Sequence, residues 1–356
     1  MQYTNLGRSG LRVSKLCLGT MTFGSGFFNI GSTSQEDANA IVKYAFEHGI
    51  NFFDSADVYS KGDSEITLGK AIKAAKIPRE KIVIATKVRG TMGDDINDVG
   101  LSRHHILNSC DASLKRLQID YIDLYQVHSF DPATPLEETM QALNDLIRAG
   151  KVRYIGVSNF AAWQISKANS IARRHGWAKF ITMQGYYSLV GRTIEHEIVP
   201  LCLDQKMGIL PWSPLAGGLL SGKYRKDKPA PKGTRLSGEL NSFIPVDHEL
   251  LYKILDVVDP IAAAHKVPVA AVALAWLAQK PAVSSVIIGA RTMNHLVENI
   301  RAADLVLTAD EIAKLDEVSK TQLPYPQWML AWTSRDRNEK SLIRGKKDEE
   351  GEAESE

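Results

Sequence analysis

Four side chains that together could place a proton on a carbonyl oxygen stand at the ends of predicted strands. Asp54 ends the segment NFFD, Lys87 ends KIVIATK, and His128 follows IDLYQV. Tyr59 comes five residues after Asp54. A phenol has an ordinary pKa of about 10, but a nearby ammonium group favours the phenolate and lowers that pKa. We therefore expect Lys87 to activate Tyr59 as a proton donor, which suits the reduction of a carbonyl group.

The other two residues have supporting roles in this interpretation. Asp54 would keep Lys87 charged and oriented, and His128 would donate a hydrogen bond to the substrate oxygen as its negative charge grows. Taken singly, each residue has an ordinary structural interpretation as a turn former, a surface group or a hydrogen-bonded histidine. Because these residues come together at the ends of neighbouring strands, we favour the catalytic interpretation over the structural one. A metal-dependent hydrolase or isomerase using Asp54 and His128 is an alternative, although the sequence has no cluster with metal-ligand spacing.

Eight short apolar runs, each followed by a helix-like segment, predict the frame that positions these residues. This alternation is typical of an α/β protein with a parallel sheet. The number of units and the length of the chain favour a (β/α)8 TIM barrel over an open doubly wound sheet. In such a barrel, functional groups come from the carboxyl ends of the strands. The predicted strands are Leu16–Gly19, Asn51–Asp54, Lys81–Lys87, Ile122–Val127, Val152–Val157, Phe180–Gln184, Gly208–Trp212 and Ser284–Ile288.

Helix caps and turn residues mark the boundaries between these runs. Ser34 and Asp37 predict the start of a helix, and Thr134 with Glu137 predicts a capping box around Pro135 at the first helical position. The segment 3–13 predicts a β-hairpin that closes the barrel floor.

The length and the composition drift along the chain predict its domain organisation. We expect a single barrel domain over residues 1–332 with an extended C-terminal segment, and a charged tail over residues 333–356. Residues 214–247 form a long connection rich in Gly, Lys and Pro, and connections of this length are usually functional or disordered.

Composition excludes several other classes of protein. A hydrophobic content of 44% and a charged content of 24% are typical of a globular chain. The longest apolar stretch, 267–278, is short for a membrane span, and the first sixteen residues lack a signal-like apolar core, so we expect a cytoplasmic protein without a membrane partner. Cys17, Cys110 and Cys202 are widely spaced, which predicts buried thiols rather than a disulfide framework or a metal site.

The charge distribution favours a small anionic ligand over nucleic acid. The net charge is +2, but Asp348–Glu356 carries six of the acidic residues. Residues 1–347 therefore hold 43 basic and 35 acidic residues, a net charge of +8. This surplus is modest for nucleic-acid binding and is sufficient for a phosphorylated small molecule if it is focused in a cleft.

Several motifs occur in the order found in one family. The sequence resembles the aldo-keto reductase superfamily over about Gln2–Leu323, in particular the branch of bacterial aldo/keto reductases and voltage-gated potassium channel β subunits. Eight motifs in order make this resemblance specific. They are LCLGTMTFG, GINFFDSADVY, SEITLGKAI, IATK, DLYQVH, GKVRYIGVSNF, WSPLAGGLLSGKY and GARTMNHLVENI.

The resemblance implies a nicotinamide cofactor bound in extended form across the barrel mouth. NADPH (or NADP+) is the expected cofactor, NADH is the less frequent one, and no GxGxxG motif of a Rossmann domain follows a strand. Asp54, Tyr59, Lys87 and His128 match the catalytic tetrad, with Tyr59 as the general acid and hydride passing from the nicotinamide to the carbonyl carbon. The reaction would be reversible.

Further residues match cofactor-binding positions of the family. Thr20 and Met21 lie in the first motif; Ser158, Asn159 and Gln184 match the carboxamide contacts, and Trp212 matches the aromatic residue that stacks on the nicotinamide ring. Ser213, Leu215 and Gly217 would contact the pyrophosphate, with Lys223 and Arg235 supplying positive charge. Gly289 and Arg291 would hold the adenosine 2′-phosphate, which favours NADPH, and Glu298 and Asn299 match the adenine contacts. His295 stands where many relatives carry Gln.

The substrate and the partners are less defined by the resemblance. Phe23, Phe27, Phe28 and Trp328 suggest an aromatic entrance for a small-molecule carbonyl substrate. The channel-like relatives leave a second hypothesis, a cofactor-binding regulatory subunit with incidental turnover, and they also suggest a homo-oligomer. The intact tetrad favours the enzyme.

Overall fold

The computed structural model describes residues 1–25, 32–226 and 244–334. It separates into two compact units, Met1–Lys320 and Thr321–Glu356. Phe27, Phe28 and Arg235 lie outside the described residues. The domain boundary that the sequence predicts after residue 332 stays a prediction.

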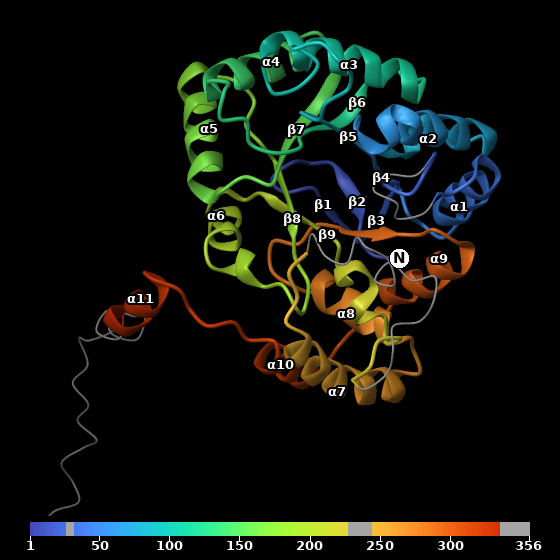
Figure 1. The fold of residues 1–356 in the computed structure, drawn as a ribbon, viewed down its shortest axis with the longest axis vertical. Coiled ribbons are helices and arrows are strands. Elements are labelled where there is room, and N and C mark those ends of the chain that lie inside the picture. Colours follow the sequence, from blue (N-terminus) through green and yellow to red (C-terminus); the bar gives the residue numbers. More distant parts are fainter. Residues whose placement is uncertain (26–31, 227–243, 335–356) are drawn as a thin grey trace, which may run out of the picture. The chain divides into compact units, whose positions relative to one another are not determined.

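Eight parallel strands form a ring in the first unit (Figure 1). Their order in the sheet is β10-β3-β4-β5-β6-β7-β8-β9, and the ring closes where Ile209 N donates to Ala282 O and Ser284 N donates to Ile209 O. This arrangement confirms the predicted (β/α)8 TIM barrel. The strands are β3 (Leu16–Gly19), β4 (Phe52–Asp54), β5 (Val83–Val88), β6 (Ile122–Val127), β7 (Val152–Ser158), β8 (Thr182–Tyr186), β9 (Gly208–Trp212) and β10 (Val286–Gly289).

Helices surround the ring because each connection between parallel strands must cross over the outside of the sheet (Figure 1). The helices of the first unit are α1 (Gln35–Glu47), α2 (Asp63–Ala74), α3 (Arg103–Leu117), α4 (Leu136–Arg148), α5 (Ala162–His175), α6 (Ile198–Gln205), α7 (His248–His265), α8 (Val269–Ala278), α9 (Met293–Ile300) and α10 (Ala309–Val318). Short 3-10 helices include η1 (Tyr59–Gly62), η2 (Arg79–Lys81), η4 (Ala216–Ser221) and η6 (Arg301–Ala303).

Local sequence signals place the helix starts with mixed success. The Ser34 side chain accepts a hydrogen bond from the Asp37 backbone N–H, which confirms the predicted cap of α1. The capping box predicted at Thr134 is wrong, because Pro135 is the N-cap and no side chain caps α4. The Thr134 hydroxyl donates instead to Asp131 Oδ2 at 2.7 Å, since Asp131 already bridges this loop to the Leu101 backbone.

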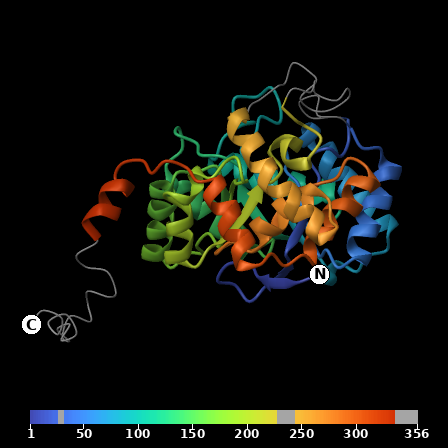
Figure 2. The same cartoon turned by 90° about the horizontal axis from the view of Figure 1, so that it is seen from below.

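The hairpin of β1 (Tyr3–Asn5) and β2 (Arg12–Ser14) closes one end of the barrel (Figure 2). Leu6 and Val13 have no exposed surface and pack against inward-facing strand residues such as Phe52. Hydrogen bonds from Ser284 Oγ to Asn5 O and from Ser285 Oγ to the Ser14 carbonyl fix the hairpin to the start of β10. The floor is therefore sealed, as predicted, and the carboxyl ends of the strands form the accessible end.

Two further predictions concern burial and the membrane. Cys17, Cys110 and Cys202 are buried free thiols. Within the described ranges, none of the helices is individually long and apolar enough to cross a membrane; α7 and α8 meet that requirement only as a pair, and they are bent by 96° at their junction.

The second unit contains α11 (Gln327–Thr333). Trp328 lies on this helix and is exposed. Its predicted place in the substrate pocket stays a prediction.

Candidate active site

The core of the site is a buried ion pair between the ends of β4 and β5. These strands are neighbours in register, with Asp54 opposite Ala85. Lys87 Nζ donates to Asp54 Oδ1 at 2.5 Å and to the Ser55 carbonyl oxygen at 2.7 Å. The two charged side chains are 0% and 3% exposed. Burial of this kind is tolerated only because each charge has its partner and further hydrogen bonds.

Two amides hold the second oxygen of Asp54. Gln126 Nε2 on β6 and Gln184 Nε2 on β8 each donate to Asp54 Oδ2 at 3.0 Å. β6 and β8 each contribute one of these side chains, and both reach Asp54 inside the barrel. The carboxylate is therefore saturated with donors and cannot rotate away from Lys87. Gln126 was not found by sequence reasoning, although its position two residues before His128 on a strand indicated the same inward face.

Tyr59 approaches the ion pair from the loop after β4. Backbone hydrogen bonds from Ser55 N to the Ala85 carbonyl and from Tyr59 N to the Ala56 carbonyl hold this loop on the barrel. Lys87 Nζ lies 3.3 Å from the Tyr59 hydroxyl and 4.9 Å from the ring centroid. The structure thus brings Asp54, Lys87 and Tyr59 into one continuous set of contacts.

The electrostatics of Tyr59 differ from the expectation. Burial raises the pKa of the phenol above its usual value, and this effect outweighs the lowering by Lys87. The predicted net lowering is therefore wrong for this state, because the sequence does not reveal how completely water is excluded. The pKa of Lys87 is raised despite its burial, since Asp54 and Tyr59 stabilise the ammonium. At neutral pH the site holds a protonated phenol beside a cation.

His128 lies next to the ring of Tyr59. Its imidazole makes an edge contact with the Tyr59 ring, with centroids 5.7 Å apart. Part of its surface remains open to the mouth, yet the surrounding protein excludes enough water to lower its pKa to about 3, helped by the positive charges of Lys87 and Arg89. His128 is therefore neutral at physiological pH and has one N–H to donate.

A second group of side chains from β7 and β9 lies next to His128. Asn159 has a positive φ of 52°, and its Nδ2 donates to the His128 carbonyl oxygen at 2.9 Å. Its Oδ1 accepts from Trp212 Nε1 at 3.2 Å, which fixes the indole. The Ser158 hydroxyl is buried and has no hydrogen-bond partner among the described residues. An unsatisfied hydroxyl beside a fixed indole and an amide fits the carboxamide of a nicotinamide ring.

A cleft of about 260 Å³ runs along η4 and α9, and Ser213, the residue after Trp212, lines it. Gly217 and Gly218 on η4 have φ of 69° and 101°, where a side chain would be strained. A Cβ at Gly218 or Gly289 would meet open space rather than protein. This exposed glycine backbone lets a phosphate group approach closely. The predicted residues that line the cleft are Ser213, Leu215, Gly217, Lys223, Gly289, Arg291, His295, Glu298 and Asn299.

Positive charge gathers at the far end of the cleft. The pKa of His295 is lowered first by burial and then by the nearby cations of Lys223 and Arg291. Asn299 Nδ2 donates to the Gly289 carbonyl oxygen at 3.2 Å and fixes the start of α9 to β10. Taken together, the unsatisfied Ser158 hydroxyl, the open glycines and this cationic end fit a dinucleotide that carries phosphate groups.

The structure places three of the predicted residues differently from the others. Thr20 is buried, and its hydroxyl contacts the Asp54 carbonyl oxygen and Ser64 Oγ. Met21 is partly exposed next to it. Phe23 has no exposed surface and packs in the main core, so in this structure it is a core residue rather than a wall of an open pocket. Thr22, which the sequence analysis passed over between them, lines the cofactor cleft.

Metal ligands are not part of this arrangement. Among the described residues, no group of three His, Cys, Asp or Glu side chains could hold a metal ion.

Ser221, Ala270 and Leu274 are further residues that line the cleft and that the sequence analysis missed. The two apolar ones carry no chemical signal, because they belong to an ordinary helical stripe until the fold places them at the cleft.

Comparisons with known proteins find one family model and several relatives of this chain. A family model described as "Aldo/keto reductase family" matches residues 15–320. Versiconal hemiacetal acetate reductase of Aspergillus parasiticus is 38% identical over 339 residues, covering 89% of this chain and 96% of that protein. The uncharacterized oxidoreductase YrpG of Bacillus subtilis is 40% identical over 327 residues, with 89% and 96% covered.

A relative from a plant extends the range of the comparison. A probable voltage-gated potassium channel subunit beta of Oryza sativa is 39% identical over 330 residues, covering 90% of this chain and 98% of that protein. The barrel, the order of its motifs and these matches over nearly the whole length agree with one another. The chain belongs to the aldo/keto reductase family of oxidoreductases.

Proposed function

We propose that this protein is an NADPH-dependent carbonyl reductase in which Tyr59 is the general acid. The observation that carries the proposal is the position of Lys87 Nζ, which contacts both Asp54 Oδ1 and the Tyr59 hydroxyl. An aldehyde or ketone oxygen beside that hydroxyl would receive its proton. A bound reduced nicotinamide supplies the hydride that the carbonyl carbon accepts.

Each residue of the tetrad has a defined task in this proposal. The Tyr59 proton moves to the developing alkoxide, and the fixed charge of Lys87 stabilises the phenolate that remains. Asp54 keeps the ammonium charged and aimed at Tyr59. Neutral His128 donates a hydrogen bond to the same substrate oxygen without adding a positive charge that would compete with Lys87. The reverse reaction, alcohol oxidation, would use the phenolate as a base.

The cofactor would lie along the cleft. Ser158, Asn159 and Gln184 would hold the carboxamide, and Trp212 would support the ring. The cationic end formed by Lys223 and Arg291 supports NADPH over NADH, because a guanidinium forms paired hydrogen bonds with a phosphate.

A panel of aldehydes, ketones, quinones and keto-sugars tests this function, with the loss of reduced-nicotinamide absorbance as the readout. We expect turnover with NADPH for at least one class. Tyr59→Phe should lower kcat by about 10²–10⁴-fold while NADPH binding, followed by fluorescence, stays within about twofold. Reduction by the variant at the wild-type rate would show that another group is the acid.

The channel-like relatives favour a second function, a cofactor-binding regulatory subunit. In that case the purified protein would bind NADPH tightly but turn over none of the panel. Light scattering would also test the predicted homo-oligomer. A reductase with ordinary turnover would make the regulatory function unnecessary.

A further inference from the structure

One buried carboxyl group beside the tetrad has no task in the chemistry above. Asp57 lies two residues before Tyr59 and has no exposed surface. Within the part of the chain that the structure describes, neither of its carboxylate oxygens has a side-chain partner, and the Val58 backbone N–H is the amide that favours its charged form. Its buried neighbours are paired, Asp54 with Lys87 and Glu65 with Arg116. A buried carboxyl group without a side-chain partner is costly, so its presence calls for an explanation.

The backbone around Asp57 is fixed to the barrel. The Asp57 N–H donates to the Lys87 carbonyl oxygen at 3.2 Å, and the Ser55 N–H donates to the Ala85 carbonyl oxygen at 2.9 Å. Lys87 Nζ returns a hydrogen bond to the Ser55 carbonyl oxygen. The turn that leads to Tyr59 is therefore held at both of these points, and Asp57 stays at a fixed place two residues before the phenol.

The surroundings favour the neutral form of this carboxyl group. Burial raises the pKa of Asp57 to about 8, and the charge of Glu65 adds to the rise. The Val58 amide, Arg116 and Lys87 oppose this effect without cancelling it. Arg116 is already engaged, because its Nε lies 2.6 Å from Glu65 Oε2. In neutral solution Asp57 therefore keeps its proton, and it ionises in mildly alkaline solution.

Ionisable groups from five elements face Asp57 or respond to its charge. They are Tyr59 on η1, Glu65 on α2, Lys87 on β5, Arg116 on α3 and Tyr125 on β6. For Tyr59 itself, burial raises the pKa most, Lys87 lowers it, and Asp54 and Asp57 each raise it. Asp54 and Lys87 are locked in an ion pair, whereas Asp57 changes charge near pH 8. Asp57 can therefore vary the acidity of Tyr59 with pH while the ion pair stays constant.

We propose that Asp57, the buried carboxyl group of the turn that is held against Lys87 and leads to Tyr59, is a positioning residue that sets how readily the phenol releases its proton. The inference rests on the proposed function, because it takes Tyr59 as the acid of reduction and the base of alcohol oxidation. An ionised Asp57 opposes the phenolate by like-charge repulsion, so alcohol oxidation should begin at a higher pH than it would without this residue.

The ionisation of Asp57 can be measured without turnover. Carbon-13 NMR of full-length protein labelled at aspartate carboxyl carbons, with Asp57→Asn to identify the signal, follows its titration. We expect a midpoint at about pH 8. A midpoint near the ordinary aspartate value of about 4 would overturn the proposal.

The link to Tyr59 needs a pH profile. In Asp57→Asn, the rise of kcat for alcohol oxidation should move to lower pH by about one unit, because the charge that opposes the phenolate is gone. KM should change little, since Asp57 does not line the cofactor cleft. Asp63→Asn is the matched control, because Asp63 stands at the start of α2 and accepts a hydrogen bond from Ser25 Oγ at the surface. Profiles of Asp57→Asn and wild type that coincide would refute the proposal.

A protein without NADPH-linked turnover would refute the proposed function, and the inference would then be decided by spectroscopy alone. Carbon-13 labelling of the tyrosine ring, with Tyr59→Phe for assignment, reports the ionisation of Tyr59. Its midpoint should be lower in Asp57→Asn than in wild type. Equal midpoints would mean that Asp57 does not act on the phenol.

Discussion

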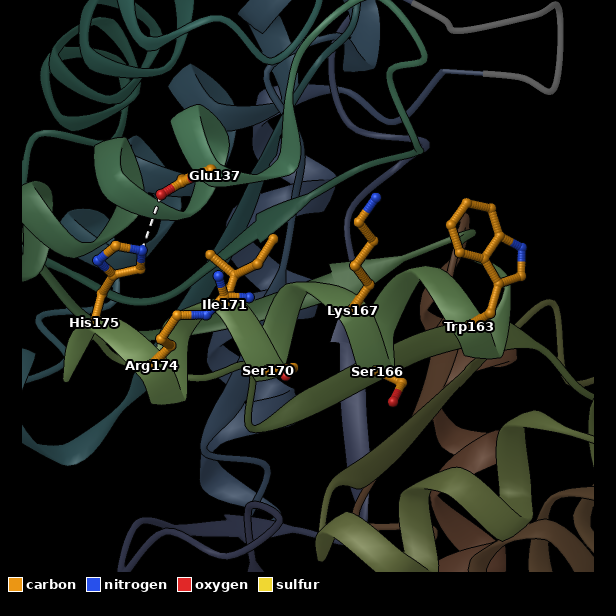
Figure 3. Close-up of a pocket in the computed structure, with 8 residues that line it drawn as sticks. All are labelled: Glu137, Trp163, Ser166, Lys167, Ser170, Ile171, Arg174 and His175. Carbon is orange, nitrogen blue, oxygen red and sulfur yellow. Dashed lines mark ion pairs between the residues drawn. The ribbon is translucent and has the colours of Figure 1, made fainter.

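Two regions of the molecule use the same kinds of charged side chain in opposite ways. At the barrel mouth, Lys87 and Asp54 are almost completely buried and share their contacts with Tyr59. On the outside, α4 and α5 border a groove in which His175 Nε2 lies 2.9 Å from Glu137 Oε1 (Figure 3). These two side chains are 36% and 59% exposed.

The difference shows that exclusion of water, rather than residue type, makes a charged group chemically useful. In the groove, Arg174 projects from α5 beside the His175 pair, and Lys167 and Trp163 follow toward the other end of the helix (Figure 3). Water and salt screen such charges, so their attractions contribute little to stability. At the mouth, burial raises the pKa of Tyr59 and lowers that of His128, and Asp54 and Tyr59 raise the pKa of Lys87 despite its burial. A change in the protonation state of these residues therefore changes their reactivity.

Replacing Lys87 should give the largest effect. Lys87→Met leaves Asp54 as a buried carboxylate without its cation, which we expect to lower the free energy of unfolding by about 3–5 kcal/mol. Urea unfolding measures this change. Lys167→Met, the same substitution in the outer groove, should change stability by less than about 0.5 kcal/mol. Equal losses for the two variants would contradict the contrast between the regions.

His128 tests whether burial at the mouth governs acid stability. Its pKa is about 3 in the folded protein, against an ordinary value of 6.5 for a solvated imidazole, so between these values only the unfolded chain takes up the proton. Stability is therefore lost as the pH falls through this window. His128→Gln should lose less stability between about pH 6.5 and 3 than wild type, in thermal unfolding at several pH values. The exposed His104→Gln is the control; a His128→Gln curve parallel to the wild-type curve would refute the assignment.

Arg291 is exposed, but it lines the cationic end of the cleft. Arg291→Ala should weaken NADPH binding by about tenfold to a hundredfold through the loss of charge-assisted hydrogen bonds, with NADH affected far less. Fluorescence titration with both cofactors measures the ratio. Arg301→Ala, which removes an exposed arginine from η6 just after α9, should leave it unchanged. An unaltered preference in Arg291→Ala would show that the guanidinium has no role in cofactor choice.

The outer pair should give the smallest effect. Glu137→Gln removes the partner of His175, and we expect a loss of less than about 1 kcal/mol with kcat unchanged. Thermal unfolding at low and high salt checks this, since any contribution should shrink as salt increases. A larger loss, insensitive to salt, would mean that the groove is less open to water than its exposure indicates.

Much of the fold could be predicted because it depends on patterns along the chain. All eight barrel strands lie within about two residues of the apolar runs, and the α1 cap follows directly from Ser34 and Asp37. Errors occurred where a neighbouring residue or a short 3-10 helix competes for a local signal. Thr134 fails as a cap because Asp131 takes its hydroxyl, and the strand predicted from Lys81 begins at Val83 because η2 occupies the preceding residues.

The site was less completely predictable. Motif order gave Asp54, Lys87, Tyr59 and His128, and the structure brings these side chains together, although their roles stay predictions. Phe23 was assigned to the pocket from its type alone and instead lies in the core. Gln126 was missed because its spacing from His128 indicates only that it faces inward, and the closed ring is what places it against Asp54.

The sequence alone determined which chemical groups this protein has and at which strand ends they stand, because strand periodicity and motif spacing are properties of the chain. Only the tertiary structure decided how those groups are charged. The raised pKa of Tyr59, the neutral imidazole of His128 and the carboxyl group of Asp57, without a side-chain partner among the described residues, all depend on how much water the closed barrel excludes. That exclusion is a property of residues far apart in the sequence, which no local pattern records.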